Sequence, residues 1–246
     1  MKIQVLLIAF LLMSVLPAAA QDSTTNPTAD EIVTRMTAHD LTRQSSVEGY
    51  YGMRRYILEN QKYHKRAEML VQVQGEKDGT KHLEVVSEDG WKAAQKHVLH
   101  KMLESEMEVS RPEMRTRAKL IPENYDFALV GTELVAGRTA YVLEVRPKRN
   151  EHYLFEGRIW VDGGDYALAR AEGKPAKKPS FWTKSIHFVQ IYQKCGPVWF
   201  PLSTQSVTEA RLVGITDVSI EYFEYAPRMP RPSDNSVVSA EARITR

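Results

Sequence analysis

The stretch YLFEGRIWVDGGDYALARAEG, Tyr153 to Gly173, decides the fold. Its two alternating segments are separated by Gly163-Gly164, which predicts a pair of strands joined by a tight turn. Successive side chains of a strand point to opposite faces, so one face of the first strand is bulky, with Phe155 and Ile159 on it. The second strand carries mostly small side chains. The hairpin is therefore large on one arm and small on the other.

The small arm presents a row of alanines, Ala167, Ala169 and Ala171, which we expect to share one face of the sheet. Because the alanine side chain is small, a row of alanines leaves space above that face of the sheet. Because protein interiors are close-packed, this volume is either filled by a helix or kept open as a cavity. The helix around Val98 to Met107 is the candidate for filling it.

Further strands are predicted on both sides of this hairpin. Between residues 50 and 87 three segments alternate with period two, and from residue 125 to residue 225 the chain is strand and turn. Antiparallel sheets of about ten strands curl or close instead of staying flat. We therefore predict an α+β fold with a single long, strongly curved antiparallel sheet.

Two helical regions accompany the strands. Thr28 and Glu31 have the spacing of a capping box, which predicts a helix starting near residue 28. After Gly90 the apolar residues recur at helical spacing up to Met107. An apolar stripe needs a partner, so we expect the helices to cover the concave face of the sheet.

The chain ends are predicted to lie outside this domain. Lys2, the apolar run that follows it and small residues at 18 and 20 have the three parts of a signal peptide cleaved after Ala20. The alternative, an uncleaved membrane anchor, would need a longer apolar run of about 20 residues. We expect a signal peptide at 1–20, a flexible segment at 21–27, one domain at 28–226 and a flexible tail at 227–246.

Composition limits the classes of function. The chain has 246 residues and a net charge of +2, which becomes +1 without Lys2, and its basic residues are scattered. This pattern lacks a nucleic-acid footprint. The densest basic loop, Lys174 to Pro179, is either a solvated connection or a docking patch. Cys195 is the only cysteine, so an internal disulfide is excluded, and we expect an exported monomer.

Catalytic patterns are weak. His97, His100 and Glu104 have helical spacing that could present metal ligands, but a third protein ligand and an ordered second shell are not evident. The alternative is a solvated helix face beside the apolar stripe. Cys195 has no histidine near it in sequence. Asp162 and Asp165 flank a turn, where carboxylates usually cap backbone N–H groups. We therefore expect neither an enzyme nor a metal or other cofactor. The remaining enzymatic hypothesis is an envelope hydrolase or metalloprotein that uses His97, His100 and Glu104.

The segment YVLEVRPKRNEHYLFEGRIWVDGGDYALARAEG resembles the central strands of the LolA/LolB-like superfamily of outer membrane lipoprotein-sorting proteins. The resemblance includes the basic-Pro step at Arg146-Pro147, the W-V-D ending at Asp162, and the order of elements from about Ala29 to Tyr225. The segment IVTRM and the later GYYG also resemble the opening of MucB/RseB-type envelope-stress regulators, which share this fold. The charge-rich helical insertion and the C-terminal tail depart from the pattern.

The resemblance implies an unclosed β-barrel with an apolar cavity for acyl chains. It implies an exported, periplasmic, non-enzymatic carrier of lipid or lipoprotein, with a membrane-bound donor or acceptor protein as a further partner. The alternative is a regulatory or sensor module of the MucB/RseB type. The candidate cavity residues are apolar positions on the predicted inner faces: Met53, Met69, Val71, Val98, Leu99, Met102, Leu103, Met107, Phe155, Ile159, Ala167 and Ala169.

Overall fold

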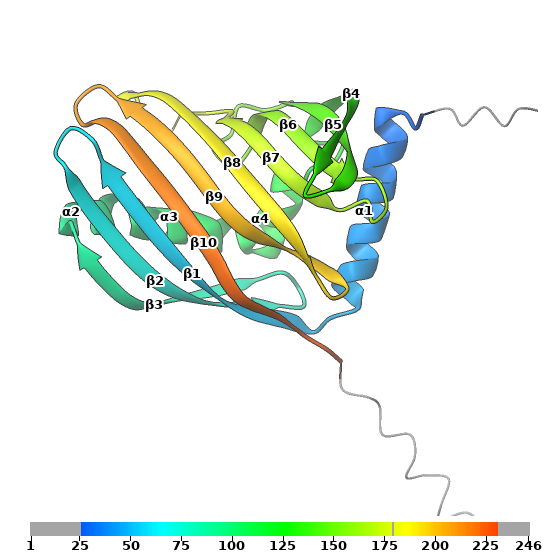
Figure 1. The fold of residues 1–246 in the computed structure, drawn as a ribbon, viewed down its shortest axis with the longest axis horizontal. Helices are drawn as coiled ribbons and strands as arrows, with labels where there is room; N and C mark the ends of the chain where they lie inside the picture. The colour runs from blue at the N-terminus through cyan, green and yellow to red at the C-terminus, as the bar shows by residue number, and fades with distance from the viewer. Residues whose placement is uncertain (1–25, 179, 231–246) are drawn as a thin grey trace, which may run out of the picture.

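The structure is a computed structural model that describes residues 26–178 and 180–230 (Figure 1). The signal peptide, most of the segment 21–27 and most of the tail predicted from the sequence lie outside these residues. The elements, in chain order, are α1 (Ala29–Ser45), β1 (Gly49–Asn60), β2 (Lys65–Glu76), β3 (Lys81–Gly90), α2 (Lys92–Ala94), a π-helical turn η1 (Gln95–Leu99), α3 (His100–Ser110), α4 (Pro112–Ala118), β4 (Tyr125–Val135), β5 (Arg138–Pro147), β6 (Phe155–Asp162), β7 (Leu168–Pro175), β8 (Thr183–Cys195), β9 (Val198–Ala210) and β10 (Gly214–Arg228).

The ten strands form one antiparallel sheet in the order β3-β2-β1-β10-β9-β8-β7-β6-β5-β4. The first strand pairs with the last, from Gly49 opposite Arg228 to Asn60 opposite Thr216. The strands β3 and β4 lie at the two edges, so the sheet curls without closing (Figure 1). The predicted α+β fold with one long, curved, unclosed sheet is confirmed.

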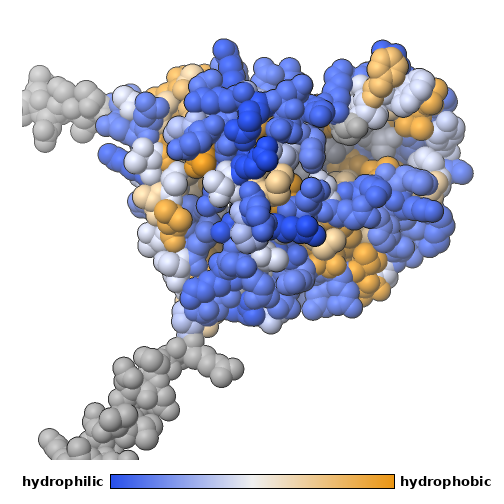
Figure 2. Space-filling view, turned by 180° about the vertical axis from the view of Figure 1, so that it is seen from behind, coloured by the Kyte–Doolittle hydropathy of each residue, from blue (hydrophilic) through white to orange (hydrophobic). Residues whose placement is uncertain are grey.

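The chain crosses from one edge to the other through α2, η1, α3 and α4, which lie on one side of the sheet (Figure 1). Leu99 and Leu103 of this connection are buried against the inward side chains of β1, β2 and β10. These helices therefore cover the β1–β3 half of the concave face. Seen from behind, this side of the molecule is mostly hydrophilic, with its apolar side chains gathered in separate patches (Figure 2).

The other half of the concave face is covered by α1. Its capping box is present, because the Thr28 side chain accepts from the backbone N–H of Glu31 and Glu31 bonds back to Thr28. Three buried residues of this helix, Ile32, Val33 and Met36, pack in one cluster with residues of β4 to β7. The helix predicted to start near residue 28 is confirmed.

Of the alanine row of the opening hairpin, Ala171 lies under α1 and not under α3. Ala171 packs in the same cluster as Ile32 and Met36. The register between β6 and β7 shifts at Trp160 and Val161, where a bulge turns Leu168 to the same cluster. Because a bulge breaks strict alternation, the expectation that Ala167, Ala169 and Ala171 share one face opposite Leu168 is wrong.

Candidate functional site

A cavity lies between the two helical covers, over the middle of the concave face. Its volume is about 700 Å³, within the range of about 300–1,000 Å³ that is usual for small-molecule sites. The wall formed by α1 and the residues after it consists of Met36, Thr37, Asp40, Leu41, Arg43, Gln44 and Val47. The segment after α4 adds Lys119, Leu120 and Ile121. The sheet side consists of Tyr50, Arg54, Lys81, Ala167, Leu168, Gln190, Tyr192, Val198, Trp199, Phe200, Pro201 and Tyr222, with Glu106 reaching in from α3.

Most of this lining is apolar or aromatic. Tyr50 and Phe200 have ring centroids 5.1 Å apart, and Tyr225 stacks on Tyr50 and lies tilted against Phe200. Val47 and Val198 are buried next to the same rings. Apolar surface removed from water contributes about 25 cal/mol per Å², so this part of the lining favours a hydrocarbon ligand.

One end of the cavity is charged. Nη1 of Arg54 lies 2.6 Å from Oε2 of Glu106, and Nζ of Lys81 lies 2.8 Å from Oε1 of the same carboxylate. Arg54 also donates from Nε to the Tyr225 hydroxyl at 2.7 Å and from Nη1 to the Tyr56 hydroxyl at 3.1 Å. We call Arg54, Lys81 and Glu106 the charged cluster.

The charged cluster stays ionised. Burial alone would raise the pKa of Glu106, but Lys81 and Arg54 hold it well below its usual range. Burial alone would lower the pKa of Lys81, but the Glu106 carboxylate raises it above its usual range. Burial raises the pKa of Tyr225 to about 12, so its hydroxyl remains neutral beside Arg54. The cluster therefore carries two positive charges and one negative charge.

Sequence reasoning missed this cluster, although signals for it exist. On β1 the side chains of Arg54, Tyr56 and Leu58 alternate in phase and are all buried. On α3, Glu106 follows Leu103 by three residues, which places both on one helix face. A charged residue in phase with buried apolar neighbours is the signal. The apolar Met53 points to the opposite face of β1 as the inner one, which hides this signal.

The structure separates the twelve predicted cavity residues. Ala167 is the one of them that lines the cavity among the described residues. Met69, Val71, Leu99 and Leu103 fill the core under η1 and α3, and Met102 packs against it. Phe155 and Ile159 belong to the core under α1. Four others lie elsewhere: Ala169 is buried in β7, Met107 is half-buried, Val98 is exposed and Met53 lies on the outer face of β1.

The expectation that Met53 lies on the inner face of the sheet is wrong. It is half-buried and alternates with Arg54, whose side chain is buried on the concave side. Because neighbouring residues of a strand face opposite ways, Met53 points to the convex side. Val98 is 38% exposed on η1, so it also lies outside the cavity.

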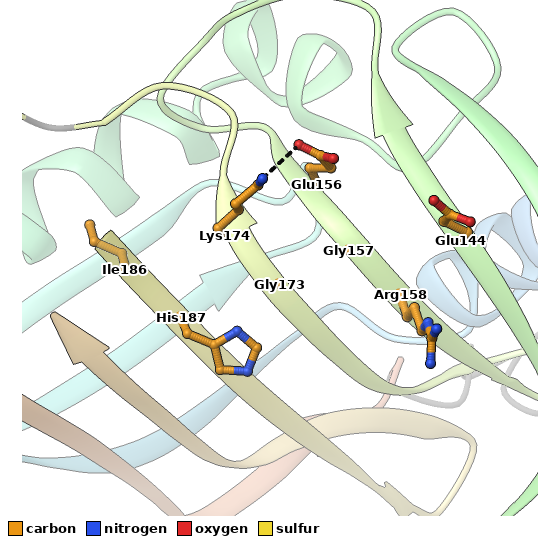
Figure 3. A pocket seen from close by; sticks show the side chains of 8 residues that line it. All are labelled: Glu144, Glu156, Gly157, Arg158, Gly173, Lys174, Ile186 and His187. Atoms are coloured by element: carbon orange, nitrogen blue, oxygen red, sulfur yellow. Dashed lines mark ion pairs between the residues drawn. The ribbon is translucent and has the colours of Figure 1, made fainter. Parts of the chain in front are cut away.

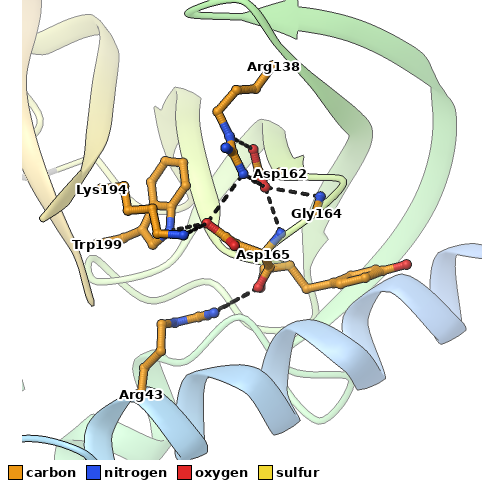
Figure 4. A network of polar contacts seen from close by, with 8 residues as sticks. Arg43, Arg138, Asp162, Gly164, Asp165, Lys194 and Trp199 are labelled. Atoms are coloured by element: carbon orange, nitrogen blue, oxygen red, sulfur yellow. Dashed lines mark hydrogen bonds and ion pairs between the residues drawn. The ribbon is translucent and has the colours of Figure 1, made fainter. Parts of the chain in front are cut away.

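The turn between β6 and β7 fastens α1 beside the cavity (Figure 4). The buried Asp162 accepts two bonds from Arg138, at 2.6 and 2.7 Å, and two from the backbone N–H groups of Gly164 and Asp165. Burial opposes ionisation of Asp162, but these donors hold its pKa below the usual range. The prediction that these aspartates serve turn structure holds for the Asp162 carboxylate, which caps two backbone N–H groups of the turn.

Asp165 extends this network to the neighbouring elements. Its carboxylate receives Nζ of Lys194 at 2.8 Å and the indole N–H of Trp199 at 3.2 Å, which ties it to the β8–β9 hairpin. Its backbone carbonyl accepts from Nη1 of Arg43 at 2.8 Å, and the Tyr166 carbonyl accepts from Nη2 at 3.2 Å. Arg43 and Trp199 both line the cavity, so the turn positions two of its walls.

A second depression, of about 340 Å³, lies over β6 and β7 (Figure 3). It forms where Gly157 is paired with Gly173, which leaves the strands without side chains at that point. Its rim is polar, with an ion pair between Lys174 and Glu156 at 3.2 Å. Since this depression is open and charged, it suits a hydrocarbon ligand less well than the cavity between the helices.

The residues of the enzymatic hypothesis have other partners. The His100 ring lies 2.6 Å from a carboxylate oxygen of Glu88, and Glu104 pairs with Lys101 at 2.6 Å. Within residues 26–178 and 180–230 no three His, Cys, Asp or Glu side chains are grouped so that they could hold a metal ion. Cys195 is a free, half-buried thiol at the end of β8.

Comparison with known proteins gives the following matches. A family of unknown function, DUF5686, matches residues 122–225, which is less than half of the chain. A search of curated proteins gave no match.

Among solved structures, a DUF1329 family protein from Desulfovibrio piger is 14% identical, with a TM-score of 0.43, and the match covers 88% of this chain and 99% of that one. A LolA superfamily protein from Nitrosomonas europaea is 12% identical, with a TM-score of 0.43 and coverage of 84% and 96%. The chain is similar to proteins of the LolA superfamily.

A putative outer membrane lipoprotein-sorting protein domain from Vibrio parahaemolyticus is also 12% identical, with a TM-score of 0.38 and coverage of 84% and 97%. Structures of MucB match with TM-scores of 0.24 and 0.25. No helix in the part of the chain that the structure describes is both long and apolar enough to cross a bilayer.

Proposed function

We propose that this protein is an exported periplasmic carrier that holds an acyl chain of a lipid or lipoprotein in the cavity between α1 and the sheet. The observation that carries the proposal is the cavity of about 700 Å³, lined mainly by apolar and aromatic side chains. Each buried methylene contributes about 0.8 kcal/mol, so a single chain supplies enough free energy to offset the cost of association. Transfer of such a ligand needs no catalytic group.

Export is part of the proposal and has its own test. Cleavage of the N-terminal segment after Ala20 would leave Gln21 as the first residue of the mature protein. N-terminal sequencing of the protein purified from a periplasmic extract checks this. A chain that keeps Lys2 and stays with the membrane fraction would contradict it.

Lipid binding is tested by native mass spectrometry of the protein purified from cells, followed by uptake of a fluorescent fatty acid. The variant Leu168→Trp places a larger side chain into the cavity wall and is expected to reduce uptake at least about tenfold. The matched control is Val207→Trp, at an exposed position of β9 outside the cavity, which should bind as the wild type does. Equal uptake by both variants would contradict the proposed site.

A further inference from the structure

The cavity lining has an excess of positive charge. It contains Arg43, Arg54, Lys81 and Lys119 against the carboxylates Asp40 and Glu106. Asp40 lies on the α1 side, where Nη2 of Arg43 is 3.9 Å away and Gln44 donates at 2.7 Å. On the sheet side Glu106 is shared by two cations. The surplus charge of the charged cluster is therefore not neutralised by the carboxylates that line the cavity.

The charged cluster also has unused hydrogen-bond donors. A guanidinium carries five N–H donors, and three of those on Arg54 are taken by Tyr225, Tyr56 and Glu106. The two on Nη2 have no acceptor among the described residues. An ammonium carries three donors, and one on Lys81 is taken by Glu106. Both side chains line the cavity, so these donors suit a ligand acceptor there.

Apart from Glu106, the tyrosine hydroxyls around these donors are neutral. Burial raises the pKa of the Tyr192 and Tyr222 hydroxyls, which line the same part of the cavity. The Tyr192 hydroxyl lies 3.0 Å from Oε1 of Gln190, and that of Tyr222 lies 3.0 Å from the Thr204 hydroxyl. A carboxylate or phosphate placed here would meet two cations in a partly desolvated site, where charge-assisted hydrogen bonds are strong.

The apolar lining begins next to the charged cluster. Arg54 donates to Tyr225, whose ring packs against Tyr50 and Phe200. Tyr50 and Phe200 pack with Val47, just after α1. Met36, Leu120 and Leu168 also line the cavity and belong to the apolar cluster under α1. The cavity thus joins a cationic cluster on its sheet side to a lining whose other residues are mostly apolar or aromatic, with Arg43, Lys119 and Asp40 as further charged residues. This is the arrangement that an amphiphile with one charged end requires.

We propose that the cavity binds an amphiphile whose anionic head group, a carboxylate or a phosphate, pairs with Arg54 and Lys81 while its hydrocarbon chain lies along the apolar lining toward α1. This inference rests on the proposed function, because it assumes that the cavity takes a chain. It adds the charge of the ligand and the direction in which it lies.

The test measures affinities of the delipidated protein for dodecanoate, dodecyl phosphate and uncharged dodecanol by isothermal titration calorimetry. The wild type should bind the two anions at least about tenfold more tightly than the alcohol. Lys81→Met removes one cation and leaves a neutral Arg54–Glu106 pair, so the ratio should fall toward one. Glu106→Gln removes the negative charge, so the ratio should rise. Because the two changes act in opposite directions, a general loss of structure cannot produce both.

The matched controls are Lys101→Met and Glu104→Gln, which change an exposed ion pair on α3, the helix that carries Glu106. Both should leave the ratio of anion affinity to alcohol affinity unchanged. Equal wild-type affinity for dodecanoate and dodecanol would overturn the head-group site while leaving the carrier function in place. No binding of any of these probes would overturn both. Inorganic phosphate alone, binding as tightly as dodecyl phosphate, would show a free-anion site and overturn the amphiphile.

Discussion

Nη1 of Arg54 and Oε2 of Glu106 lie 2.6 Å apart, and this ion pair joins β1 to α3 across the concave face. Arg54 is buried, with 2% of its surface exposed, so it depends on this carboxylate and on two tyrosine hydroxyls for its partners. The helical cover and the sheet are thus held together by charge as well as by the apolar contacts of Leu99 and Leu103.

Glu106→Leu is therefore expected to destabilise the protein strongly. Breaking a buried ion pair by removing one partner costs about 3–5 kcal/mol, because the other charge remains buried without compensation. The free energy of unfolding, measured by urea denaturation, checks this. Glu104→Leu on the exposed face of the same helix should change it by less than about 0.5 kcal/mol. Similar unfolding midpoints for the two variants would mean that the ion pair does not support the fold.

The acidic limit of stability is expected to depend on Asp162. Its pKa is lowered in the folded protein, so its contribution is complete above about pH 5 and is lost as the pH falls through the folded-state value. Asp162→Ala should cost about 2–3 kcal/mol at pH 7, since a charged acceptor of four hydrogen bonds is removed. Thermal denaturation at pH 7 and pH 3 measures the difference, which should shrink at the lower pH.

The control for this change is Asp126→Ala, an exposed carboxylate on β4 whose side chain is 73% accessible. It should differ little from the wild type at either pH. A deficit of Asp162→Ala that stays constant between pH 7 and pH 3 would show that the ionised carboxylate is not the source of the stability.

Gly157→Ala is expected to destabilise the β6–β7 pair. A Cβ at this position would lie 2.0 Å from the carbonyl oxygen of Glu172 and 2.6 Å from the Cα of Gly173, so the backbones would have to move apart. Overpacking of this kind costs about 1–3 kcal/mol. Gly131→Ala on β4 is the matched control, because nothing lies within 4 Å of its added Cβ. Chemical denaturation of both variants should show a loss only for Gly157→Ala.

Alternation and helical spacing were sufficient to predict the strands, the capping box and the helical cover, because they depend on local patterns that burial enforces. Apolarity alone predicts that Met53 faces inward on β1, while the structure buries Arg54 on the concave side through partners on β10 and α3. Such partners are distant in sequence. The cavity likewise depends on how α1 and α3 divide the concave face, which no local pattern specifies.

The sequence pattern also fails to predict which face of the sheet Leu168 takes. Strict alternation placed it opposite Ala171, but the bulge after Trp160 turned it inward to the cluster under α1 and to the cavity wall. The extra residue is Ala169, and a single extra residue in one strand reverses the faces of the side chains before it relative to those after it. The Gly-Gly turn itself was predictable, and the bulge beside it was not.

Arg43 is expected to control the release of a bound chain. It closes α1 onto the β6–β7 turn with bonds to the Asp165 and Tyr166 carbonyls. Each is worth about 1 kcal/mol, so Arg43→Ala should accelerate dissociation of a fluorescent fatty acid by roughly tenfold or more in stopped-flow measurements. Arg55→Ala, on the convex face, is the control. Amide hydrogen exchange in α1 should also increase in Arg43→Ala. Faster release with unchanged exchange in α1 would indicate that Arg43 contacts the ligand without fastening the helix.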